Sequence, residues 1–142
     1  MAKEPDPFHL QRFLEAQAPV YDHVVAELRE GHKRTHWMWF IFPQIAGLGS
    51  SPMATKYAIS SPAEARAYLA HPVLGARLEE CVSLVNQHEG RAIEAMLGHP
   101  DDMKFRSSLT LFHHVAPESS VFQEALDRFY AGAPDPLTLA RL

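Results

Sequence analysis

Apolar residues recur at intervals of three and four along most of the chain, which is the spacing that places them on one face of an α-helix. The two longest stripes run from Leu74 to Val85 and from Phe122 to Tyr130, and shorter stripes cover 10–17, 21–28, 65–69, 93–97 and 105–112. Outside 37–42, no run alternates apolar and polar residues over the length of a strand, and the chain has no Asn-Gly or Asp-Gly turn. The pattern predicts an all-α fold of about seven to eight short helices in an orthogonal or irregular bundle.

Proline and glycine set the expected helix boundaries, because proline is favoured in the first helical turn and glycine after the last. Asp6-Pro7 and Ala18-Pro19 are expected to open the first two helices, and Gly31 to end the second. Ser61-Pro62-Ala63-Glu64 predicts a capping box, in which the serine oxygen accepts a backbone N–H and the glutamate reaches back to the cap. The last residues, after Pro136, are expected to form one more turn.

Composition narrows the functional classes. With 142 residues, 46% hydrophobic and 21% charged, the chain is expected to form a single domain over residues 1–142 with its own core. The net charge of −4 argues against nucleic-acid binding as the main task, and no apolar run is long enough to span a membrane. The single cysteine, Cys81, and the polar start of the chain favour a reducing, cytoplasmic location.

The segment from His36 to Gln44 holds both tryptophans and two further aromatic residues. One interpretation is a central segment buried on all sides. The other leaves one edge exposed, so that the indole of Trp37 and the ring of His36 line a pocket for a flat ligand. Gln44, at the end of the segment, is then placed to recognise a polar edge of that ligand.

A loop rich in small residues follows, and long loops in compact domains often carry function. Gly47 and Gly49 allow the backbone to approach a ligand closely, and Ser50 precedes an expected helix start at Ser51-Pro52. A helix N-terminus after such a loop can bind an anion. The third glycine of a dinucleotide-binding motif is missing, so the alternative is a turn that only caps the next helix.

Lys104, Ser107 and Ser108 share one face of an expected helix, at the edge of its core face. They predict a cradle for a phosphate or carboxylate group. The alternative is a solvated lysine, with both hydroxyls bonded to carbonyl groups one turn earlier. If the protein is an enzyme, His36 is the expected acid or base, and Asp101 or Asp102 is the carboxylate expected to orient it.

Nine histidines raise the question of a metal site. His32 and His36 have a spacing suited to two ligands on one helical face, but Gly31 precedes them directly and no His-Glu-x-x-His motif is present. No metal and no cofactor is therefore expected. Cys81 lies within an apolar stripe and is expected to be a core residue.

The sequence resembles a mainly bacterial family catalogued as domain of unknown function 1810, many of whose members carry the label calpastatin. The blocks that carry the resemblance span nearly the whole chain: Asp6-Pro7-Phe8, Arg12-Phe13, Gln17, Tyr21, 36–44, Gly47-Leu48-Gly49, 57–59, Glu64-Ala65, Tyr68-Leu69, His71-Pro72, Leu74-Gly75, Arg77-Leu78, Asp101, Lys104 and 107–112. The resemblance implies a compact, mainly helical domain and assigns no reaction. Calpain inhibitors of that label are long disordered chains, whereas this sequence has the pattern of a globular domain.

Two functions follow from these features. The first is a protein that binds or hydrolyses a small anionic molecule, nucleotide or ADP-ribose-like, in a pocket formed by residues 36–51 and 104–110. The second is a non-catalytic interaction or dimerisation module that uses the segment with Trp37 and Trp39. Polar residues that converge in a concave site favour the first, and indoles exposed on a flat patch favour the second. Whether the protein is an enzyme, and whether it forms a homo-oligomer, stays open.

Overall fold

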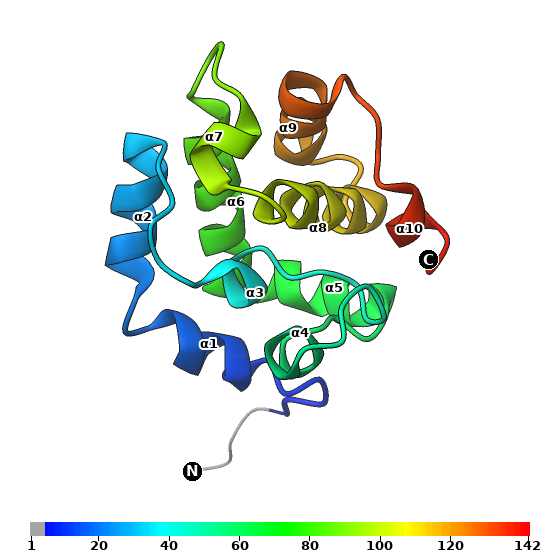
Figure 1. The fold of residues 1–142 in the computed structure, drawn as a ribbon. Helices are drawn as coiled ribbons and strands as arrows, with labels where there is room; N and C mark the ends of the chain where they lie inside the picture. The colour runs from blue at the N-terminus through cyan, green and yellow to red at the C-terminus, as the bar shows by residue number, and fades with distance from the viewer. Residues whose placement is uncertain (1–4) are drawn as a thin grey trace.

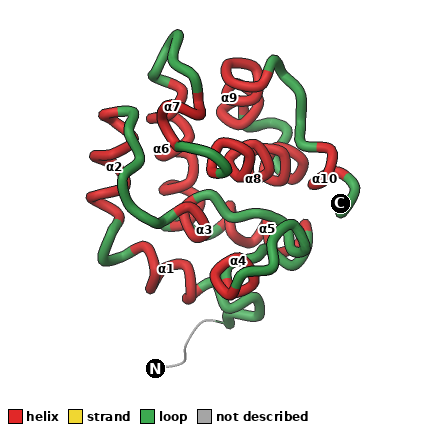
Figure 2. Tube along the Cα trace, viewed as in Figure 1, coloured by secondary structure: helices red, strands yellow, loops and turns green. Residues whose placement is uncertain are grey.

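The computed structural model describes residues 5–142. Over this range the structure is helical, with loops between the helices and no named strand (Figure 2). The ten helices are α1 (Gln11–Gln17), α2 (Tyr21–Glu30), α3 (Met38–Ile41), α4 (Pro52–Lys56), α5 (Pro62–Ala70), α6 (Leu74–Asn86), α7 (Ile93–Leu97), α8 (Asp101–Val115), α9 (Ser120–Tyr130) and α10 (Pro136–Leu139). The predicted all-α class is confirmed. The helices outnumber the expected seven to eight because α3, α4 and α10 are single turns of four or five residues.

Helix α8 runs through the middle of the molecule, and α5, α7, α9 and α10 pack around it (Figure 1). Its buried residues include Phe105, Leu109 and Phe112 but also the small hydroxyl residues of its second and third turns. A helix buried on most of its surface must be apolar or carry short side chains that bond to its own backbone. Both apply here, since Thr110 donates from its hydroxyl to the carbonyl of Arg106 over 2.9 Å.

The first helix starts later than the prolines predict. Asp6 accepts hydrogen bonds from the backbone N–H groups of Leu10 and Gln11, at 2.7 and 3.0 Å, and His9 has a positive φ of 53°. The carboxylate therefore holds residues 6–10 in turns, and α1 begins only at Gln11. The end of α2 matches the prediction, because Gly31 adopts the left-handed conformation with a φ of 73°.

Half of the predicted capping box forms at the start of α5. Ser61 accepts from the N–H of Glu64, as expected. Glu64 does not return to the N–H of Ser61: its Oε1 accepts from the N–H of Ser60 and its Oε2 from Arg12, both at 2.8 Å. The guanidinium of Arg12 competes for the carboxylate, since a charge-assisted hydrogen bond is stronger than one to a neutral donor.

Arg12 also joins the N-terminal helix to the chain around α4. It donates to the carbonyls of Lys56 and Ala58 over 2.8 and 3.0 Å. A single parallel bridge between Ile45 and Ile59 closes this region, through hydrogen bonds of 2.8 Å on both sides. These contacts give the irregular segment from 43 to 60 a defined shape, although little of it is helical.

No helix in the described part of the chain is both long enough and apolar enough to cross a membrane.

Candidate functional site

A cavity of about 260 Å³ lies where the loop after α3, the helix α4, the first turns of α8 and the start of α10 meet. Its walls are mainly apolar, with a few polar groups among them. The lining residues are Trp39, Gln44, Ile45, Gly47, Leu48, Gly49, Ala54, Tyr57, Ala58, Pro100, Met103, Lys104, Ser107, Asp135 and Leu137. Such concave, largely apolar sites with a few polar groups are typical of small-molecule binding.

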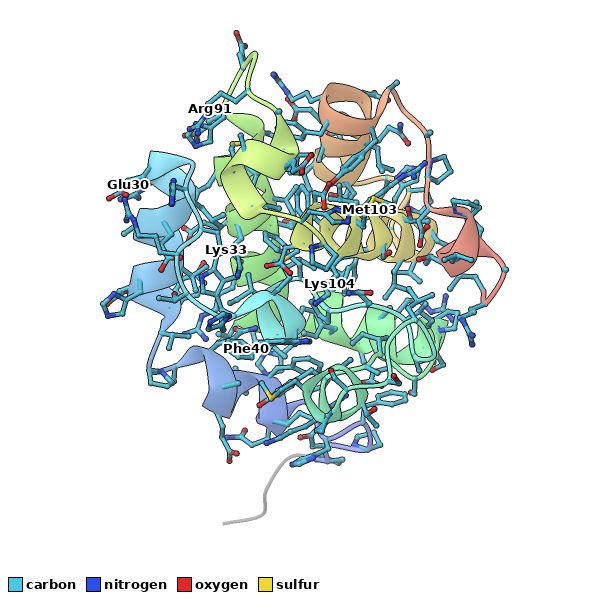
Figure 3. All side chains as sticks on the ribbon, in the orientation of Figure 1. Glu30, Lys33, Phe40, Arg91, Met103 and Lys104 are labelled. Carbon is cyan, nitrogen blue, oxygen red and sulfur yellow. The ribbon has the colours of Figure 1, made fainter. Side chains whose placement is uncertain are left out.

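Lys104 supplies the positive charge of this cavity. Its Nζ lies 5.2 Å from the centre of the Trp39 ring and 3.6 Å from Oδ1 of Asp101. The second oxygen of Asp101 forms an ion pair of 2.9 Å with Lys33 (Figure 3 labels both lysines, between α2, α3 and α8). The carboxylate of Asp101 therefore forms ion pairs with two ammonium groups. The Lys104 side chain is still 29% exposed, so these contacts do not enclose it fully.

Asp135 supplies a negative charge, and the residue is buried, with 5% of its surface exposed. Its Oδ2 accepts three hydrogen bonds: from the hydroxyl of Ser107 at 2.9 Å, and from the N–H and hydroxyl of Thr138 at 3.1 and 2.6 Å. Its own N–H donates to the hydroxyl of Thr110 over 2.8 Å. Asp135 is thus the N-cap of α10 and is fastened to α8 at the same time.

Five predicted ligand-binding residues lie together on the cavity wall. They are Gln44, Gly47, Gly49, Lys104 and Ser107. Gly47 has a φ of 97°, which side chains other than glycine rarely adopt. The guanidinium group of Arg141 covers it, so that an added Cβ would meet that group at 2.2 Å. The side chain of Arg141 therefore packs against the loop that follows α3.

Trp37 does not line this cavity. Of the two interpretations of residues 36–44, the buried one applies to the indole of Trp37. The residue is 1% exposed, its ring packs against Phe42, and its Nε1–H donates to Glu27 over 3.1 Å. The indole on the cavity wall is that of Trp39. The two tryptophans flank Met38 at the start of the short helix α3, where residues two positions apart point in nearly opposite directions.

Ser50 and Ser108 also lie off the cavity wall. Ser50 is exposed in the loop before α4. Ser108 is buried in the core, with a hydroxyl oxygen that has no partner in the described part of the structure. The expected anion site at Ser51-Pro52 is weak, because α4 has only five residues and Ser51 itself accepts the N–H of Ala54.

The two residues predicted to be catalytic do not meet in the cavity. His36 is exposed, and among residues 5–142 no hydrogen bond joins it to Asp101. Asp101 is paired with Lys33 and Lys104 instead, because two nearby ammonium groups attract it more strongly than one imidazole. Within the described range no group of three His, Cys, Asp or Glu side chains is arranged to hold a metal.

Cys81 is buried and 1% exposed, as its apolar stripe predicts. Burial raises the pKa of its thiol to about 12, so it lacks the low pKa of a reactive cysteine.

Analysis of the sequence alone missed Trp39 as the cavity indole, and it missed Tyr57, Met103, Asp135 and Leu137 altogether. For Asp135 a local signal exists: Asp-Pro followed by a threonine is typical of a capped helix start. That signal predicts a cap but does not place the cap against α8.

Comparison with known proteins identifies a family and a solved structure to which the chain is similar. The sequence model of a family described as "Protein of unknown function (DUF1810)" matches residues 7–142. The chain is also similar to the conserved hypothetical protein Rv1873 from Mycobacterium tuberculosis, with 56% sequence identity. The match to the crystal structure of that protein covers 96% of this chain and 98% of that one, with a TM-score of 0.95. Comparison with curated proteins gives no match.

Proposed function

The chain belongs to the DUF1810 family, whose function is unknown, and from its cavity we propose that it binds a small anionic molecule with a flat ring, of the nucleotide or ADP-ribose-like class. The observation that carries this proposal is the meeting of an indole, a partly exposed ammonium group and several hydrogen-bonding groups in one concave apolar site.

Each part of the cavity wall supplies one element of that recognition. The ring of Trp39 offers a face for stacking with a base or an edge for a T-shaped contact. Lys104 is a compact positive charge for a phosphate group, and Gln44 carries both a donor and an acceptor for a polar edge. The volume of about 260 Å³ lies just below the roughly 300–1,000 Å³ of typical ligand pockets, so the site suits at most one nucleoside unit, and a larger molecule would extend past its mouth.

The proposal is limited to binding. His36 and Asp101 were the expected catalytic pair, and neither lines the cavity. The alternative of an interaction surface loses its principal contact, because Trp37 is buried and Trp39 faces a concave site. Met103 and Leu137, two of the large apolar residues that are exposed, also lie on the cavity wall rather than on a separate patch.

A thermal-shift panel tests the proposal with ribonucleoside 5′-phosphates, dinucleotides and ADP-ribose. A ligand at a hundred times its Kd stabilises the native state by about 2.7 kcal/mol, which raises the melting temperature by on the order of 10 °C. We expect such a rise in the wild type and its loss in Lys104→Met.

Lys56→Met is the matched control, because the Lys56 ammonium also lies over an aromatic ring, 5.3 Å from that of Tyr57, but does not line the cavity. Its response should equal that of the wild type. A cooperative melt that none of these compounds shifts would contradict the proposal, and so would an equal shift in Lys104→Met.

A further inference from the structure

We propose that Asp135 recognises a hydroxyl group of the ligand, so that the site selects a molecule with a ribose-like diol rather than any flat anion. This inference rests on the proposed function, because it assigns a specificity-determining residue to the same cavity. No feature of the sequence around Asp135 points to it beyond a helix cap.

The hydrogen bonds of Asp135 leave one oxygen for a ligand. Oδ2 accepts from Ser107 and twice from Thr138, so its lone pairs are used. No donor in the described part of the chain reaches Oδ1. Oδ1 is not fully buried, and Asp135 lines the cavity. Oδ1 is therefore a free and accessible acceptor on a residue that lines the cavity.

Helix α8 holds this carboxylate in one orientation. Arg106 donates to the carbonyls of Ala133 and Pro134 over 2.9 and 3.0 Å, and Thr110 accepts from the N–H of Asp135. The segment before α10 is thus fastened at three successive residues. A side chain held in this way loses little conformational freedom when a ligand binds.

The charges in the cavity determine which part of a ligand Oδ1 can accept. A carboxylate only accepts hydrogen bonds, and it repels a phosphate group. A phosphate group therefore belongs beside Lys104 and a neutral donor beside Asp135. A sugar hydroxyl next to the base is such a donor, and a nucleotide carries it between the ring and the phosphate.

Substitution by asparagine reverses the polarity of the group that faces the cavity. Three donors point at the Oδ2 position, so the single oxygen of an asparagine must stay there, and its NH₂ group takes the position of Oδ1. Asparagine is as good an N-cap as aspartate, so α10 should keep its start. The variant Asp135→Asn thus removes the acceptor and leaves the cavity in place.

The experiment compares calorimetric affinities for the four ribonucleoside 5′-monophosphates with those for their 2′,3′-dideoxy analogues. For the nucleotide that binds, we expect the wild type to prefer the ribose form by about 10- to 100-fold, the range for one hydrogen bond to a charged group. Asp135→Asn should lose this preference and still bind the dideoxy form.

Asp6→Asn is the matched control, because Asp6 also accepts backbone N–H groups at a turn, lies off the cavity wall and changes the net charge equally. It should keep the preference of the wild type. Equal affinity of the wild type for ribose and dideoxy forms would overturn the role of Asp135 and leave the proposed function intact. Absence of binding by either form would count against the proposed function itself. The comparison on the wild type needs no variant to fold.

Discussion

Glu27 is the residue on which the loop between α2 and α3 depends. It is 6% exposed and accepts four hydrogen bonds, from the N–H groups of Arg34 and Thr35, the hydroxyl of Thr35 and the indole of Trp37. Burial raises the pKa of this carboxyl group, but the hydrogen bonds outweigh burial, and the pKa is lowered from the ordinary 4.5. The ionised form is therefore the one that stabilises the fold.

Replacing Glu27 by glutamine should lower the free energy of unfolding at pH 7 by about 1–3 kcal/mol, since hydrogen bonds to a charge are replaced by weaker ones. Because the folded pKa is depressed, the contribution of the carboxylate is complete above pH 4.5 and is lost as the pH falls through the folded value. Urea unfolding at several pH values should thus show the difference from wild type shrinking below pH 4.5. Glu30→Gln, an exposed neighbour paired with Arg34, should show neither effect. A difference that is constant with pH would contradict the role of the charge.

The two tryptophans show where prediction from sequence ends at this scale. Their density predicts a segment that is buried at least in part, and the core position of Trp37 agrees. Trp37 directly precedes α3 and Trp39 lies within it, so the two rings face different sides, but the residues alone do not say which side the core lies on. That choice depends on Glu27 and Phe42, which bind and contact the Trp37 ring.

At the scale of elements, the hydroxyl of Thr110 couples α8 to the start of α10. It accepts the N–H of Asp135, and the two residues are 25 positions apart in the chain. A pattern of apolar residues predicts that α8 is a helix and that a turn follows Pro136, but it contains no information on a hydrogen bond between them. The sequence therefore predicted cavity residues such as Lys104 and Gln44 near α3 and α8, and it predicted no cavity residue at the start of α10.

Thr110→Val keeps the shape of the side chain and removes the acceptor, which leaves a buried N–H without a partner. We expect a loss of about 1–3 kcal/mol in the free energy of unfolding and faster hydrogen exchange at the amides of Asp135 and Thr138. Thr55→Val, at an exposed position, is the control. Unchanged exchange at residues 135–138 would show that α10 is held to α8 by other contacts.

At the scale of the whole molecule, α8 is the element that most of the others share (Figure 1). Phe105, in the second turn of this helix, is fully buried, and its ring lies 4.7 Å from that of Phe42. Truncation of such a side chain costs about 3–5 kcal/mol, a large part of the roughly 5–15 kcal/mol that stabilises a native domain. The central place of α8 implies that this loss is felt throughout the protein rather than only around the cavity.

Cys81 on α6 can report whether that is so. Its thiol is 1% exposed with a pKa raised by burial to about 12, so a thiol reagent reaches it only when the structure opens. If the molecule opens as one unit, Phe105→Ala should speed labelling of Cys81 by roughly 150- to 4000-fold, the factor that corresponds to a loss of about 3–5 kcal/mol at 1.4 kcal/mol per tenfold. The loss measured by urea unfolding should match that factor. An unchanged labelling rate would instead mean that Cys81 is exposed by a local opening, of which the nearest candidate is the separation of α2, since its Tyr21 hydroxyl lies 3.8 Å from the sulfur.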